Sequence, residues 1–236
     1  MDKTDNTNLS FRQKLDNFMY HYKWHTIAVC FIIFVVIWAG ASLISNGGGE
    51  DMYIGYIGEY AYSNEEIGEI QDKMSKKLSF DINGDQKTSI GLMSFHYYTA
   101  EQIENKAQEA KDKGEDWGFY PELNAKNYEH FVTELDNGST SVWLVSKEVY
   151  EGMDKSALVP IESILGYTPE RGAVDEYAID CSTLPFCNET TREISFNTYL
   201  VLRVRKNHSF IMGEGKAQEE LENAKKLFCA IVEYKK

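Results

Sequence analysis

An uncharged apolar segment near the N-terminus constrains this chain more than any other feature of its sequence. No Asp, Glu, Lys or Arg occurs between Ile27 and Ile44. A helix over the 21 residues from Trp24 to Ile44 would be about 30 Å long at roughly 1.5 Å per residue, which matches the hydrocarbon core of a bilayer. A helix of this length in water would need polar positions facing solvent. The sequence therefore predicts a transmembrane helix at residues 24–45.

The flanks of this segment predict its orientation, because Lys and Arg favour the cytoplasmic side of a membrane. The basic residues that precede it are Lys3, Arg12, Lys14 and Lys23. We therefore expect residues 1–23 in the cytoplasm, a Gly-rich linker at 46–51 and an extracytoplasmic domain at 52–236. The chain would be a single-pass protein of the cell membrane, with the lipid bilayer as a partner. A cleaved signal peptide is the alternative, since Ala39-Gly40-Ala41 resembles a cleavage site.

The segment before the span is predicted to be an amphipathic juxtamembrane helix. Its apolar residues recur at helical spacing, which would place them on one face. They are Phe11, Leu15, Phe18, Met19 and Tyr22. Such a helix can lie on the inner leaflet.

Charge divides unevenly along the chain. The net charge is -13 in total and +1 over residues 1–49, so the remainder carries -14. An acidic domain repels a polyanion, and nucleic acid is therefore not an expected partner. The composition, 43% hydrophobic and 26% charged, is that of a globular chain and excludes complete disorder.

Strands alternate with helices along residues 52–236. The strand patterns lie at 52–57, 89–98, 141–145 and 198–205. Helices are expected after the capping boxes that begin at Ser63 and Thr99, after the N-cap residues Asn124 and Ser146, and at 216–234. This alternation predicts an α/β fold, a single domain with a central sheet flanked by helices.

One loop has the spacing of a calcium site. Oxygen ligands at positions 1, 3, 5 and 9, with a backbone carbonyl at position 7, converge on a hard cation. The corresponding residues are Asp81, Asn83, Asp85, Lys87 (through its carbonyl) and Ser89. Gln86 stands where this pattern has glycine and Leu92 where it has a bidentate acid, which excludes a full EF-hand. A weak Ca²⁺ site and a metal-free turn rich in Asp and Asn remain the two alternatives.

Cysteines and catalytic motifs give less information. Cys181 and Cys187 are close enough in sequence to form a disulfide in an oxidising compartment, and two buried thiols are the alternative. The sequence contains no G-x-S-x-G, H-E-x-x-H or phosphate-loop motif. This favours a binding role over an enzymatic one, and no catalytic or cofactor-binding residue is predicted.

Two segments resemble known families. The segment FRQKLDNFMYHYKWHTI, together with Asp81 to Lys87, resembles uncharacterised single-pass membrane proteins of low-GC Gram-positive bacteria. The stretch from Thr140 to Met153, followed by Ala157 to Ile161, is similar to part of the extracellular solute-binding proteins of ABC importers. That resemblance implies a strand, a short helix and then a turn. Because residues 52–236 suffice for one substantial core but not for two full domains, we expect a reduced solute-binding lobe.

The sequence therefore predicts a membrane-anchored extracytoplasmic module that binds a small ligand or an envelope protein, with calcium as a candidate stabiliser. Two alternatives stay open. One is a cell-envelope hydrolase with dispersed catalytic carboxylates. The other is a structural component of an envelope complex.

Overall fold

The computed structural model describes residues 18, 20, 22, 24, 27–29, 31–35, 50–79, 81–82, 84–138, 140–203 and 214–235. The chain divides into two units, residues 1–49 and 50–236. In the first unit the described residues are helical, and the rings of Phe18 and Tyr22 stack at 5.2 Å. Most of the predicted segments at 1–23, 24–45 and 46–51 lies outside the described residues. None of the helices formed by described residues is both long enough and apolar enough to cross a bilayer.

The second unit is built on one mixed sheet. Its strands in the described part of the chain are β1 (Met52–Gly58), β2 (Ile90–His96), β3 (Val142–Ser146), β4 (Ala178–Asp180) and β5 (Thr198–Leu202), in the order β2-β1-β3-β5-β4. The first three strands are parallel, and β5 is antiparallel to both β3 and β4. This confirms the predicted α/β fold with a central sheet flanked by helices.

Helices connect these strands. Their bounds are α2 Asn64–Lys77, α3 Ala100–Lys113, α4 Pro121–Asn137, α5 Lys147–Gly152, α6 Ile161–Leu165, α7 Pro185–Thr190, α8 Arg192–Ser195 and α10 Glu214–Val232. The predicted caps Ser63, Thr99 and Ser146 begin α2, α3 and α5. The capping boxes of Ser63 with Glu66 and of Thr99 with Gln102 are both formed. Each box satisfies backbone N–H groups that the first turn leaves without a partner.

Two hydrophobic cores lie on the two faces of the sheet, because side chains alternate along a strand. On β1, Ile54 packs in one core and Ile57 in the other. The first core also holds residues of α2, α7 and α10, and the second holds Phe131 of α4 and residues of α5. Trp143 of β3 is fully buried in the second core, where its indole Nε1 donates to the Thr140 carbonyl at 3.0 Å.

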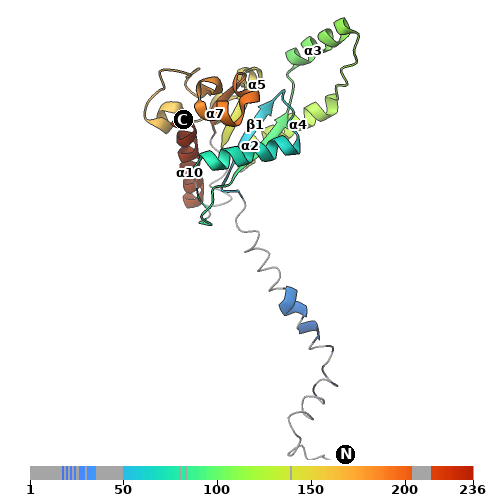
Figure 1. The fold of residues 1–236 in the computed structure, drawn as a ribbon, viewed down its shortest axis with the longest axis vertical. Helices are drawn as coiled ribbons and strands as arrows, with labels where there is room; N and C mark the ends of the chain where they lie inside the picture. The colour runs from blue at the N-terminus through green and yellow to red at the C-terminus, as the bar shows by residue number, and fades with distance from the viewer. Residues whose placement is uncertain are drawn as a thin grey trace, which may run out of the picture. The chain divides into compact units, whose positions relative to one another are not determined.

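Helix α3 differs from the other long helices because none of its residues is buried. Figure 1 shows it lying away from the sheet, joined to α4 by a long connection. Two glycines of this connection, Gly114 and Gly118, have positive φ angles of 69° and 48°, which glycine adopts at little cost. We refer to residues 100–120 as the arm.

The start of α4 differs from the prediction. The helix begins at Pro121, which is favoured in the first turn because it lacks the N–H group that would otherwise be unbonded there. Asn124 is therefore inside the helix rather than at its cap. Its side chain binds the backbone of Tyr98 instead: Oδ1 accepts from the Tyr98 amide at 2.8 Å, and Nδ2 donates to the Tyr98 carbonyl at 3.0 Å.

Candidate ligand-binding site

The carboxyl ends of the three parallel strands lie at one edge of the sheet. From β1 the chain crosses to β2 on one side, and β3 lies on the other side of β1. In open α/β sheets the crevice at such a reversal of strand order is where ligands bind, because the loops after the two strands diverge there. A ligand site is therefore expected beyond the ends of β1 and β3.

A hollow of about 240 Å³ occupies this place. We call it the switch-point hollow. Strand ends, the arm and the connection from α8 to β5 supply its lining. The side chains used below are Tyr56, Glu59, Tyr60, Lys106, Glu193, Phe196 and Asn197.

Tyr56 and Phe196 contribute the aromatic part of the lining. The Tyr56 hydroxyl accepts from the backbone amide of Tyr60 at 3.1 Å. Burial raises the pKa of Tyr56, so its hydroxyl stays protonated and keeps a hydrogen to donate. The ring of Phe196, by contrast, is 67% exposed. An exposed aromatic face next to a buried hydroxyl is the kind of mixed surface that small-molecule sites use.

Polar contacts fix the side of the hollow nearest α5. Asn197 donates its amide to both carboxylate oxygens of Glu148, at 3.2 and 3.1 Å. Lys147 lies 3.4 Å from the carboxylate of Asp180 at the end of β4. Burial opposes the charge of Asp180, but hydrogen bonds from Ser182 and the nearby ammonium outweigh it and lower the pKa. The bonds of Asn197 hold the α8–β5 connection against α5, and the ion pair of Lys147 joins α5 to the end of β4.

An ion pair closes the opposite side of the hollow. The ammonium of Lys106, on α3, lies 3.0 Å from the carboxylate of Glu59, which follows β1. The same ammonium is 5.4 Å from the centre of the Tyr98 ring. Burial disfavours the charged form of Lys106, but the hydrogen bond to Glu59 and the charge of Glu59 outweigh it, so the pKa of Lys106 is raised.

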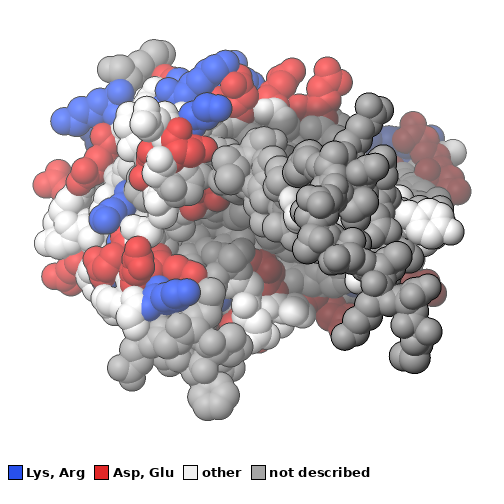
Figure 2. Space-filling model, turned by 90° about the horizontal axis from the view of Figure 1, so that it is seen from below, with Lys and Arg blue, Asp and Glu red and all other residues white. Residues whose placement is uncertain are grey.

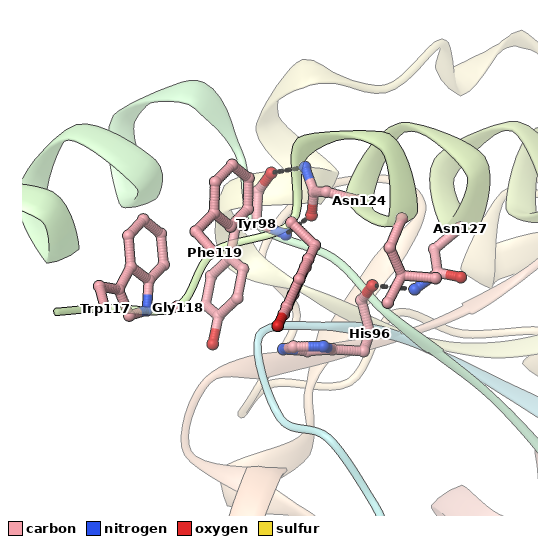
Figure 3. Close-up of a pocket in the computed structure, with 9 residues that line it drawn as sticks. His96, Tyr98, Trp117, Gly118, Phe119, Asn124 and Asn127 are labelled. Atoms are coloured by element: carbon pink, nitrogen blue, oxygen red, sulfur yellow. Dashed lines mark hydrogen bonds between the residues drawn. The ribbon is translucent and has the colours of Figure 1, made fainter.

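Beyond this ion pair a second hollow, of about 190 Å³, is lined by aromatic rings. We call it the aromatic hollow. The rings of Trp117 and Phe119 stack at 4.7 Å, and Tyr98 stands nearly perpendicular to both. Figure 3 shows these three rings to one side and His96 to the other, with Asn127 donating to the His96 carbonyl at 2.8 Å. The arm thus contributes to both hollows.

His96 ends β2 and lines the aromatic hollow. Burial lowers its pKa, and this is partly opposed by the backbone and charge of Glu59. Within the described part of the chain the buried Nε2 has no hydrogen-bond partner. The imidazole is therefore held in its neutral form.

The predicted calcium loop folds as a turn bonded through its carboxylates. The two oxygens of Asp81 accept from the amides of Gly84 and Gln86, at 2.7 and 2.9 Å, and Asp85 accepts from Lys87 at 2.9 Å. Gln86 has a φ of 66°, so a non-glycine residue adopts the left-handed conformation at the position where the calcium pattern has glycine.

An acid distant in sequence closes the loop. Asp51 accepts from the amides of Ile82 and Ser89, both at 2.8 Å. Asn83, which the sequence places among the calcium ligands, lies outside the described residues. The described residues contain no group of three or more His, Cys, Asp or Glu side chains placed to hold a metal ion. The bonding observed is that of the turn alternative, and calcium stays a prediction.

The cysteine pair lies in the first core. Cys181 and Cys187 are free thiols and both are buried. A hydrogen bond to Cys181, together with burial, raises the pKa of the Cys187 thiol, so the thiol stays protonated and unreactive. The two side chains act as core residues here.

Surface charge does not point to a different site. Figure 2 shows acidic and basic side chains interspersed over the described part of the face in view. Charges of both signs spread over this face do not form a patch of one sign that would mark a separate site. The hollows at the strand ends therefore remain the best candidates.

Neither hollow could be found by sequence reasoning. Their lining comes from segments far apart in the chain, such as Glu59, Lys106 and Phe196. The available signal was weak: polar and aromatic residues directly follow the strands at Glu59 and Tyr97.

Protein-family models, curated proteins and solved structures were compared with the chain, and none of them matches it.

Proposed function

We propose that this chain is a membrane-anchored extracytoplasmic module that binds a small ligand in the switch-point hollow. The observation that carries the proposal is the position of that hollow, at the reversal of strand order between β1 and β3. The resemblance of residues 140–161 to solute-binding proteins supports it, since β3 and α5 follow the strand and short-helix order which that resemblance implies.

The anchor is a separate part of the proposal and rests on the apolar sequence of residues 24–45. Apolar side chains of this segment that the structure describes are exposed, among them Phe31 and Phe34 at 65% and 63%. Exposed apolar side chains on a helix have a lower free energy in lipid than in water. Their exposure therefore supports a membrane anchor.

The hydrolase alternative depends on the two carboxylates that line the hollow, Glu59 and Glu193. A general acid and a general base must both be aimed at the reacting bond. Glu59 is engaged by Lys106 at 3.0 Å, and Glu193 lies on the exposed side of α8. Binding therefore accounts for these residues better than proton transfer does.

A thermal-shift screen of the full-length chain in mild detergent tests the binding function. The screen covers sugars, amino acids, peptides, amines and divalent ions. At least one class is expected to raise the unfolding midpoint, because a ligand that binds only the folded state stabilises it. Phe196→Ala should abolish that shift, whereas Tyr167→Ala, which removes another exposed ring, should leave it unchanged.

If no class of compound moves the midpoint, the small-ligand function is wrong. Co-purification of a stable partner from membranes would then favour the structural alternative. The calcium proposal is decided in the same screen: equal midpoints in EDTA and in millimolar calcium would leave the Asp81–Ser89 segment as a turn only.

A further inference from the structure

Lys106 shows what kind of chemical group the sheet edge accepts. Its ammonium lies between a carboxylate and an aromatic face, 3.0 Å from Glu59 and 5.4 Å from the centre of the Tyr98 ring. A carboxylate supplies the opposite charge, and the negative face of an aromatic ring adds a second attraction to a cation. The carboxylate lines the switch-point hollow and the ring lines the aromatic hollow, so together they form a site for an ammonium ion where the two hollows meet.

The backbone that carries these two groups is held independently of Lys106. Glu59 directly follows β1, in the middle of the sheet. The backbone of Tyr98 is fixed by the side-chain amide of Asn124, through bonds of 2.8 and 3.0 Å. Removal of the lysine head group would therefore leave the backbone of both residues in place, so that the carboxylate and the ring can meet another ammonium.

Lys106 itself is held weakly. It belongs to α3, in which no residue is buried, and the side chains of Lys106 and Glu59 are 34% and 38% exposed. An ion pair this exposed contributes little to stability because water screens it. A ligand that carries its own ammonium can therefore displace Lys106 at small cost.

The remaining charge of the hollow also favours a cation. Glu193 lines it and has no ion-pair partner within the described part of the chain. Once Lys106 is displaced, Glu59 and Glu193 leave the lining with net negative charge, which repels anions. The exposed ring of Phe196 favours an organic cation over a hydrated metal ion, because it offers an apolar surface to a carbon chain.

We propose that the switch-point hollow binds a primary amine and that Lys106 occupies the ammonium position in the free protein. This inference rests on the proposed binding function and specifies its ligand class. The lysine side chain acts as a tethered competitor, and amine binding releases α3 from the end of β1.

The inference makes an unusual prediction: removing a residue that lines the site should strengthen binding. We would titrate the full-length chain in detergent with n-butylamine, whose four-carbon chain matches the lysine stem, and monitor NMR shifts. Lys106→Met should lower the dissociation constant about two- to fivefold, the size expected for loss of an exposed ion pair. Lys113→Met, at an exposed lysine of the same helix, is the matched control and should not change it.

Two further measurements separate the amine site from nonspecific effects. Glu59→Gln should weaken n-butylamine binding at least tenfold, and 1-butanol, which has no charge, should not compete. Weaker binding in Lys106→Met, or equal binding of 1-butanol, would overturn the inference.

Failure of the inference can be told apart from failure of the binding function. If a sugar, an acidic peptide or a divalent ion raises the midpoint in a Phe196-dependent way while n-butylamine has no effect, the hollow binds ligand but the amine assignment is wrong. If n-butylamine and every other probe have no effect, both proposals are wrong.

Discussion

The guanidinium of Arg203 shows how one buried charge can hold distant segments together. Arg203 is completely buried. Its Nη2 donates to the carbonyls of Glu134 and Gly138, and its Nε to that of Thr140, all at 2.8 Å. The first two carbonyls belong to the end of α4, where a cation is favourable. The residue directly after β5 thus fixes the end of α4.

Arg203→Lys should destabilise the fold by about 3 kcal/mol, because an ammonium cannot reproduce the planar fork that donates to three carbonyls at once, and hydrogen bonds from a charged donor are the stronger ones. Urea unfolding followed by circular dichroism measures this loss. Arg171→Lys, at an exposed position, is the control and should stay near the wild-type value. Equal stability of the two variants would contradict this account of Arg203.

The pKa of His96 predicts a pH dependence of stability. Burial lowers this pKa below the ordinary value of 6.5, so the folded state binds the proton less readily than the unfolded state does. The contribution of His96 to the free energy of unfolding is therefore fully present above pH 6.5. It is lost as the pH drops through the folded-state pKa. The charge of nearby Lys106 also lowers the pKa of His96, whereas Glu59 raises it.

Unfolding measured at pH 7.5 and pH 5.5 tests this sign. The wild type should lose stability on acidification, and His96→Gln should lose less, because that side chain does not titrate. His130→Gln, on the exposed face of α4, should behave as the wild type does. A larger acid loss in His96→Gln would show that the sign is wrong.

At the scale of elements, the Asp81–Ser89 turn depends on one residue outside it. Asp51 directly precedes β1, and its two carboxylate oxygens bind Ile82 and Ser89, which lie at the two ends of the turn. Those bonds fix the position of Ser89, the residue before β2. They thereby support the parallel register of β1 and β2, in which Met52 pairs with Ile90.

Asp51→Ala should cost roughly 1–2 kcal/mol, the value of two partly exposed bonds to a carboxylate. It should also speed hydrogen exchange at the amides of Ile82 and Ser89, as measured by NMR. Glu104→Ala, which removes an exposed acid of α3, should change neither quantity. Unchanged exchange in Asp51→Ala would mean that the turn closes without this residue.

At the scale of the whole molecule, the division into residues 1–49 and 50–236 separates a predicted anchor from a domain with its own two cores. We expect the full-length chain to sediment with membranes and to resist extraction by alkaline carbonate. The truncated chain 50–236, expressed without an export signal, should stay in the supernatant and unfold cooperatively. Release of the full-length chain by carbonate would refute the transmembrane assignment.

Local signals determined the parts of this fold that depend on neighbouring residues. The capping boxes at Ser63 and Thr99 and the β-branched and aromatic run of β1 need only a few consecutive positions, and the structure confirms them. Strand β4, with three residues, is too short to give a periodic pattern. Its place in the sheet comes from pairing with β5, a contact that no local pattern encodes.

The candidate site was decided by tertiary structure alone. Glu59, Lys106 and Phe196 are separated by long stretches of sequence and meet only because antiparallel β5 begins at the edge where the parallel strands end. The same long-range geometry gave Asn124 a role at Tyr98 in place of the cap predicted for it. Sequence by itself determined the alternation of elements and the apolar segment, since both follow from periodicity and hydropathy; only packing of the sheet could determine which side chains share a hollow.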